Sequence, residues 1–367
     1  MRESQAIPSS ENGLNRMMLT LLAFVVVAGV IILVHEVGHF IAARLAGMRV
    51  ERFSIGFPPR MVSKTIGKTE FVLSWIPLGG YVKIAGMVDE SLDKNPITGA
   101  PDEFMSKNPF QKVFVLCAGV AMNYLVAGLI MTGLTMAIGI GEVGEPVIGG
   151  VSDTTMPAAA AGLQKGDRIL QVGDSLVKDW SGVVALISTA SDTVHLTLAR
   201  ADSVWSVAVP TVPHTDGDKT RRVIGIVAEV SFREASLGES LEQGVRFCYI
   251  TTAGIVDFFR QLIMGEASIR DLSGPVGVAR LSGESARQGL GTFLFFLAFV
   301  SVSIGFLNIL PFPALDGGHI FYVIIEVFIR RPISTKVKLA IQQVGLALLI
   351  LLVLVVSYHD ILRLFGR

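Results

Sequence analysis

The stretch "VHEVGHF", residues 34–40, ends a long apolar run and places two histidines and a glutamate where hydrocarbon is expected. Titratable groups are costly to bury in a bilayer, so chains retain them there mostly where they perform a function. Because His35 and His39 are four residues apart, they share one face of a helix. Two neutral imidazoles one turn apart can bind a single Zn²⁺, and Glu36 beside them can activate a water molecule. Alternatively, the two histidines and the glutamate bind no metal and only form hydrogen bonds across a helical bundle.

The composition of the whole chain indicates a membrane protein. Of its 367 residues, 51% are hydrophobic and 17% are charged, and the mean hydropathy is +0.59. This is more apolar than an ordinary soluble domain. The 31 basic and 31 acidic residues balance, so the net charge gives no reason to expect a nucleic-acid partner. Cys117 and Cys248 lie far apart, which predicts free thiols rather than a disulfide framework.

Four segments are apolar and long enough to cross a bilayer, which takes about 20 residues. They are residues 17–42, 113–140, 291–329 and 339–358. A polar tail, residues 1–16, precedes the first segment, which we interpret as a retained span rather than a cleaved signal peptide. The third segment is too long for one straight helix, and Pro311 and Pro313 interrupt it. Broken helices at membrane depth face protein or a water-filled cavity, so the break marks a site.

The distribution of basic residues predicts the orientation. The loop 43–112 carries ten lysines and arginines, and the short loop 330–338 carries four more. By the positive-inside rule, both loops are cytoplasmic. The termini and residues 141–290 then lie outside. We therefore expect a multi-pass protein of the inner (cytoplasmic) membrane, in contact with the lipid bilayer.

The long outer region has two parts. Residues 143–213 alternate apolar and polar positions between glycine- and aspartate-containing turns, which is typical of a small β-rich domain. Residues 214–290 read as an amphipathic linker region. Within it, residues 236–264 predict an amphipathic helix. That helix could lie on the membrane surface or pack on the β-rich domain, and the sequence leaves both possibilities open.

A third metal ligand is needed, because catalytic zinc usually keeps three protein ligands and one open position. The candidate is Asp316, in "NILPFPALDGGH" at the break in the third apolar segment. Asp316 could instead, or in addition, cap the helix that restarts there. His319 is a rival ligand three residues further on, to which we assign a supporting role.

The paired motifs "HEVGHF" and "NILPFPALDGG" resemble those of the site-2 protease family of intramembrane zinc metalloproteases. Four further stretches are also similar to family segments. They are "LGGYVKIAGM" (78–87, a membrane-associated β segment), "AGVAMN" (118–123, a glycine–asparagine motif), "PAAAAGLQKGDRILQVGD" (157–174, a PDZ domain) and "SGPVGVA" (273–279). One departure is Val120, where the family often has proline.

The resemblance implies a polytopic α-helical membrane protein of about four transmembrane helices. It carries an inserted β-rich PDZ domain, residues 143–213, and a membrane-associated β segment within the cytoplasmic loop. The implied metal is one Zn²⁺ per chain, held by His35, His39 and Asp316. The resemblance assigns Glu36 as general base and acid, and Asn308 as a residue that helps to hold substrate.

The implied function is regulated intramembrane proteolysis in a stress response. The substrate would be a single-span membrane protein of the anti-sigma-factor type, already trimmed by an upstream site-1 protease. Hydrolysis requires local unwinding of the substrate helix, whose freed backbone groups then need partners. Residues 69–84 are apolar and β-prone, so they could pair with the unwound segment. The alternative is a plain hairpin that shields the site.

Two further hypotheses concern the outer domain and the rival functions. We expect the PDZ-like domain to exclude substrates with bulky outer parts, rather than only to recruit trimmed ones. The main rival function is a catalytically inactive scaffold or chaperone that binds membrane helices. A transporter or channel with a metal site would explain the broken helix, but the sequence contains no inverted repeat.

Overall fold

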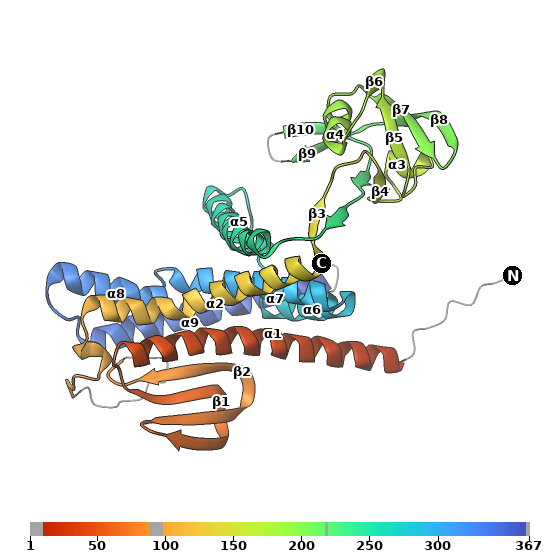
Figure 1. Ribbon diagram of the computed structural model, residues 1–367. Helices are drawn as coiled ribbons and strands as arrows, with labels where there is room; N and C mark the ends of the chain where they lie inside the picture. Colours follow the sequence, from red (N-terminus) through yellow and green to blue (C-terminus); the bar gives the residue numbers. More distant parts are fainter. Residues whose placement is uncertain (1–9, 88–97, 217–218, 365–367) are drawn as a thin grey trace. The chain divides into compact units, whose positions relative to one another are not determined.

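The computed structural model describes residues 10–87, 98–216 and 219–364. The chain divides into two compact units. A helical unit comprises Met1–Leu134 with Leu237–Arg367, and a β-rich unit comprises Thr135–Ser236. Within these described ranges, four helices of the helical unit are long and apolar enough to cross a membrane, which confirms the prediction of four such helices (Figure 1). They are α1 (Ser10–Leu45), α2 (Pro109–Ile138), α7 (Leu290–Ile309) and α9 (Thr335–Leu364).

The third apolar segment is divided as its prolines predict. Helix α7 ends at Ile309, and α8 (Asp316–Ile329) begins seven residues later. Leu310 precedes Pro311 and has an extended conformation, with φ −63° and ψ 143°, because proline disfavours the helical conformation in the residue before it. Residues 310–315 therefore form a non-helical turn between α7 and α8.

Helix α5 (Leu237–Met264) packs against the helical unit. The Tyr124 hydroxyl of α2 lies 2.9 Å from the Thr252 hydroxyl, and the ring of Phe247 lies 5.4 Å from that of Phe295 on α7. These contacts place the predicted amphipathic helix against α2 and α7 of the helical unit. Tyr249 and Ile263 on α5 remain exposed. The next long helix, α6 (Pro275–Gln288), places Gly283 directly against Thr20 of α1.

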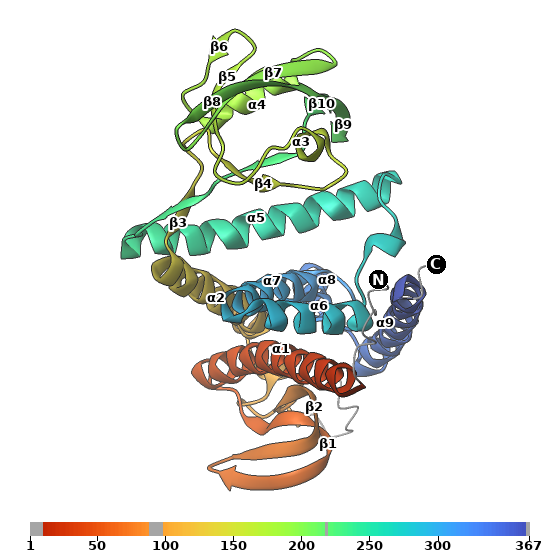
Figure 2. The same cartoon turned by 90° about the vertical axis from the view of Figure 1, so that its right-hand side faces the viewer.

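A curled hairpin of β1 (Val50–Ile66) and β2 (Thr69–Ile84) lies beside α1 in both views (Figures 1 and 2). Residues 50–55 pair with 80–84 on one side and with 70–73 on the other, while 60–66 pair with 69–74. Because both strands curl back, the hairpin forms a sheet of four adjacent strand segments, in which residues 80–84 are one edge. Phe40 of α1 packs against two hairpin rings, with its centroid 5.4 Å from that of Phe53 and 5.8 Å from that of Phe71.

The β-rich unit is built on one four-stranded antiparallel sheet in the order β6-β5-β7-β8. Its strands are β5 (Arg168–Val172), β6 (Ser175–Leu176), β7 (Thr193–Arg200) and β8 (Ser203–Pro210). Helices α3 (Pro157–Ala160) and α4 (Trp180–Ser188) complete its core. Between α4 and residues 221–226 lies a groove of about 320 Å³ with an apolar wall that includes Val183, Ile187 and Ile224.

The bounds of this unit differ from the predicted 143–213. The hairpin β9 (Val212–Asp216) and β10 (Lys219–Val223) continues the unit beyond that range. Strand β11 (Ile226–Ala228) then pairs with β4 (Ile148–Val151), and β12 (Ser231–Arg233) pairs with β3 (Ile140–Glu142). Residues 214–236 are therefore part of the β-rich unit and not of a linker. The sequence does not reveal the pairing of β11 and β12, because strands of three residues are too short to show an alternation of apolar and polar positions.

A buried carboxylate joins β7 of the β-rich unit to the turn before β5. Asp167 is fully buried and accepts hydrogen bonds from Arg200 at 2.6 and 2.8 Å and from the Gln164 amide at 2.9 Å. Burial alone would raise the pKa of Asp167, but these hydrogen bonds lower it below its usual range. A depressed pKa stabilises the fold above the pKa of the unfolded chain, and this stabilisation is lost as the pH falls through the folded value.

We predict that Asp167→Asn destabilises the β-rich unit by about 1–2 kcal/mol at pH 7, because hydrogen bonds to a charge are removed while Arg200 stays partly solvated. Hydrogen exchange of β5 and β7 amides in the full chain should be roughly 5–30-fold faster than in the wild type. The difference should shrink below about pH 4. Asp192→Asn is the matched control, since Asp192 pairs with Arg222 but is 90% exposed. Equal protection in both variants would contradict the prediction.

Candidate metal centre and active site

Helix α1 places His35 and His39 on one face, one turn apart. Both residues are buried, at 7% and 8% exposure. Their rings are nearly perpendicular, with centroids 4.7 Å apart, and their Nε2 atoms approach to 3.1 Å. The His39 Nδ1–H donates to the carbonyl of Val115 on α2 at 2.9 Å. This hydrogen bond leaves the His39 Nε2 lone pair free, as a metal ligand requires.

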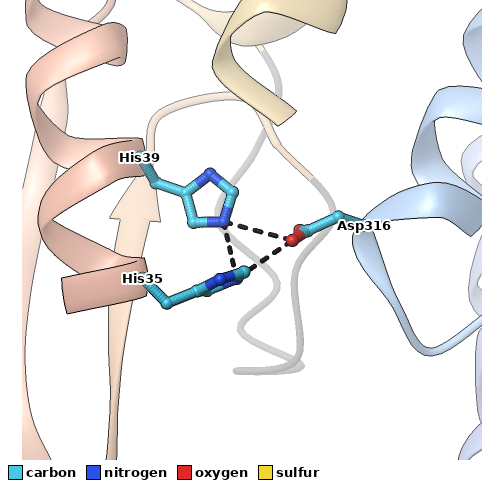
Figure 3. Close-up of side chains that lie close together, drawn as sticks. All are labelled: His35, His39 and Asp316. Atoms are coloured by element: carbon cyan, nitrogen blue, oxygen red, sulfur yellow. Dashed lines mark hydrogen bonds and ion pairs between the residues drawn. The ribbon is translucent and has the colours of Figure 1, made fainter. Parts of the chain in front are cut away.

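The start of α8 brings Asp316 to the same point (Figure 3). Its Oδ2 lies 3.0 Å from His35 Nε2 and 3.3 Å from His39 Nε2. The two glycines that follow are required, because a Cβ at Gly317 would collide with the Ile309 and Leu310 carbonyls and one at Gly318 with the Phe312 carbonyl. The helix cap is Leu315 and not Asp316, which is the first helical residue. Asp316 is therefore not the N-cap of α8, which the sequence had left as a possibility.

The three ligand atoms fit a tetrahedral metal ion. Ligands at about 2.0–2.1 Å from Zn²⁺ lie roughly 3.3 Å from one another in a tetrahedron, and the observed separations are 3.0, 3.1 and 3.3 Å. Among the described residues, buried Asp316 Oδ2 has no hydrogen-bond partner of acceptable geometry. Lone pairs of an imidazole and a carboxylate that face each other repel unless a cation lies between them. The donor set of two imidazoles and one carboxylate suits zinc.

Helix α2 leaves the space in which this cluster sits. A Cβ added to Gly119 would lie 2.5 Å from His39 Nε2 and 2.8 Å from His35 Nε2. Helices α1 and α2 also touch at Gly38 of α1, where a Cβ would collide with the Ala118 carbonyl of α2. Gly119 was not singled out as a site residue from the sequence, although it opens the "GVAMN" stretch of an uncharged apolar segment. The Val115 carbonyl was also missed, because a backbone acceptor leaves no signal in the sequence.

The remaining predicted residues surround the cluster. Glu36 lines the same cavity but is not among the side chains close enough to share a metal ion. The Asn308 Nδ2 atom lies 3.5 Å from His35 Nε2, a long contact. His319 lines the cavity outside the ligand cluster and packs edge-on against Tyr322, with ring centroids 6.0 Å apart. His319 is thus placed as a neighbour of the cluster.

The cavity that contains these groups has a volume of about 260 Å³. One wall is the edge of the curled sheet, because Gly79, Tyr81, Val82 and Ile84 line the cavity. A Cβ at Gly80 would lie 3.7 Å from the Glu36 side chain. An open sheet edge therefore runs beside a carboxylate and three convergent ligand atoms, an arrangement suited to holding an extended peptide next to a metal ion.

Two histidines in the HExxH pattern, with a carboxylate from another helix as the candidate third ligand, form an arrangement typical of metalloproteases. The chain belongs to peptidase family M50, whose family model matches residues 23–352. The resemblance to the site-2 proteases is thereby confirmed. A protein of Clostridium perfringens named "putative zinc metalloprotease" is 34% identical, with 93% of this chain and 97% of the relative covered. A Helicobacter pylori protein of the same name is 33% identical, with 91% and 97% covered.

A third relative carries a more specific name. The "Regulator of sigma-W protease RasP" of Bacillus subtilis is 26% identical, with 94% of this chain and 99% of the relative covered. The similarity to all three relatives therefore extends over almost the whole length of each chain.

We predict that Gly119→Ala weakens zinc binding at least about 10-fold, because the added methyl group would occupy the space beside both Nε2 atoms. Gly133→Ala is the matched control on the same helix, since a Cβ there meets nothing within 4 Å. Metal content after dialysis against a chelator measures the effect, and circular dichroism checks that both variants stay helical. Equal zinc retention in the two variants would show that Gly119 is not part of the metal cradle.

Proposed function

We propose that this chain is an intramembrane zinc metalloprotease that cuts peptide bonds within transmembrane segments. The observation that carries the proposal is the convergence of His35 Nε2, His39 Nε2 and Asp316 Oδ2 within 3.0–3.3 Å of one another. All three come from the unit that contains the four apolar helices. A hydrolytic centre built between such helices acts on segments that reach it within the membrane.

Each residue has a distinct role in the proposed reaction. His35, His39 and Asp316 hold one zinc ion per chain, which would supply Lewis acidity toward the scissile carbonyl and toward the attacking water. Glu36 takes a proton from that water and later delivers it to the leaving amine. Asn308 has a side-chain amide that can hydrogen-bond the carbonyl or amide groups of an unwound substrate.

The sheet edge explains how a helical substrate can be cut. Peptide bonds of a transmembrane helix are shielded because their N–H and C=O groups are paired within the helix. Residues 80–84 pair with 50–55 on one side only in the described part of the chain, and their other side borders the cavity. An unwound segment that pairs with this edge regains the hydrogen bonds it gave up on unwinding. The edge supports a substrate-binding role over a merely shielding hairpin.

The name of one relative supports the proposed substrate class. The name of the Bacillus subtilis relative describes a regulator of a sigma factor, and we propose an anti-sigma-factor-like, single-span substrate for this chain. An upstream site-1 protease would first trim it. We assign the β-rich unit as a PDZ domain, whose groove between α4 and residues 221–226 would bind an extended peptide. The size-exclusion role of this unit stays a hypothesis.

The rival function is an inactive scaffold that binds membrane helices. Such a protein needs neither a metal cluster nor a carboxylate beside it, and retaining buried polar groups without use is costly. The complete set of ligands together with Glu36 therefore favours the protease.

We predict that Glu36→Gln reduces cleavage of a single-span substrate by at least about 100-fold, because proton transfer is abolished, while the bound zinc is retained. His35→Ala, His39→Ala and Asp316→Ala should lose both activity and metal. Metal analysis and a cleavage assay on the purified full chain decide between these outcomes. Glu266→Gln, on an exposed residue, is the matched control and should behave as wild type. Cleavage by Glu36→Gln at the wild-type rate would reject the catalytic assignment.

We also propose that the β1–β2 hairpin is cytoplasmic and the β-rich unit extracytoplasmic, in an inner-membrane protein. The support is the excess of basic residues in loop 43–112.

Single cysteines at Ser63 and Ser175 test this orientation, because both residues are exposed. In a background with Cys117 and Cys248 replaced, Ser175→Cys should react with a membrane-impermeant reagent in intact cells. Ser63→Cys should react only after permeabilisation. Labelling of both positions from the same side would overturn the proposed orientation.

A further inference from the structure

Asn123 is a buried polar residue on α2 to which neither the proposed reaction nor the family match gives a role. Its side chain is fully buried. Its backbone carbonyl accepts a hydrogen bond from Ser301 Oγ of α7 at 3.0 Å. A Cβ at Gly305 would lie 3.3 Å from the Asn123 Cβ, so α7 packs closely against this residue. Asn123 is thus enclosed between α7 and the metal-ligand face of α1.

The carboxamide of Asn123 faces His35. Its Nδ2 atom lies 3.4 Å from His35 Nδ1, while its Oδ1 atom is buried and has no hydrogen-bond partner among the described residues. A buried carbonyl oxygen without a partner is destabilising. The two ends of a carboxamide have nearly the same shape, so hydrogen bonding decides which end faces a neighbour.

The chemistry of His35 settles which end must face it. If Nε2 is a metal ligand, its lone pair is used for the metal and the ring proton resides on Nδ1. An Nδ1–H group needs an acceptor, which the amide oxygen of Asn123 supplies and its NH₂ group does not. Turning the carboxamide by 180° pairs Oδ1 with the Nδ1–H donor. The same rotation gives the buried Oδ1 atom the donor it lacks and places the NH₂ group where Oδ1 stood.

His39 shows the same arrangement with a different acceptor. Its Nδ1–H donates to the Val115 carbonyl, and Val115, Gly119 and Asn123 follow one another at intervals of four residues along α2. These three positions share a face of the helix. One face of α2 therefore supplies an acceptor for each histidine, with the gap at Gly119 between them. The backbone carbonyl is fixed, whereas the acceptor for His35 depends on the side chain at position 123.

We propose that Asn123 is a positioning residue that holds His35 in the Nδ1–H tautomer and orients its Nε2 atom toward the metal. The proposal rests on the proposed metal site and deepens it. Acceptors that hold metal-binding histidines in this way typically change metal affinity by about 10–100-fold when they are removed.

The test compares two substitutions of similar size in the purified full chain. Asn123→Leu removes the acceptor, and Asn123→Asp keeps an acceptor whichever oxygen faces His35. Zinc affinity, measured by competition with a chromophoric chelator, should fall by about 10–100-fold in Asn123→Leu and stay within about threefold of wild type in Asn123→Asp. Ser301→Ala is the packing control, because Ser301 contacts the Asn123 backbone and not His35. It should bind zinc as wild type does.

Nitrogen-15 NMR of the zinc-loaded wild type gives a second readout that does not depend on any variant folding. The proton on His35 Nδ1 should exchange slowly with water, because the buried Asn123 oxygen accepts it, and fast exchange of this proton would overturn the proposal.

Three affinity results would also overturn it. They are wild-type affinity in Asn123→Leu, equal weakening in Asn123→Leu and Asn123→Asp, and equal weakening in Ser301→Ala and Asn123→Leu. A wild-type chain that binds no zinc would instead reject the proposed function itself, so the two failures are distinguishable.

Discussion

The structure depends on bringing three polar side chains together in a part of the chain that is otherwise apolar. His35 and His39 lie on α1 and Asp316 begins α8, so distant parts of the sequence must meet within a few ångströms. Each group would be costly to bury alone. Three features reduce that cost jointly: the Gly38–Ala118 contact that joins α1 to α2, the proline break after α7 and the turn that admits α8. If any one of these features were removed, a ligand would be buried without its partners.

The irregular backbone is concentrated at the place where it can be used. Residues 310–315 are not helical. The Leu315 carbonyl nevertheless accepts hydrogen bonds from the Gly318 and His319 amides, so regular helical hydrogen bonding resumes at the start of α8. The sheet edge at residues 80–84 is the second set of open backbone groups beside the cavity. Regular helices satisfy their own hydrogen bonds, so a membrane-embedded site gains open donors and acceptors only by such local departures.

Much of this could be read from the sequence, because the signals are local. The four-residue spacing of His35 and His39 fixes a shared helical face, and Pro311 and Pro313 locate the break near Asp316. The rest is non-local. The central position of residues 50–55 in the curled sheet depends on pairing with two separate segments. The β-rich unit closes through very short strands at its two ends. The acceptor at Val115 is a carbonyl that every residue possesses, so no pattern distinguishes it.

The Gly38–Ala118 contact has a mechanical consequence for the proposed metal centre. With no side chain between the two backbones, the contact acts as a pivot, and relative tilting of α1 and α2 moves atoms in proportion to their distance from it. At a rise of about 1.5 Å per residue, a residue about 24 positions from Gly38 lies roughly 36 Å away and shifts by about 3 Å for a tilt of about 5°. The ligand atoms beside the pivot move far less. Changes in bilayer thickness that tilt α1 would therefore displace its N-terminal end while leaving the coordination geometry almost unchanged.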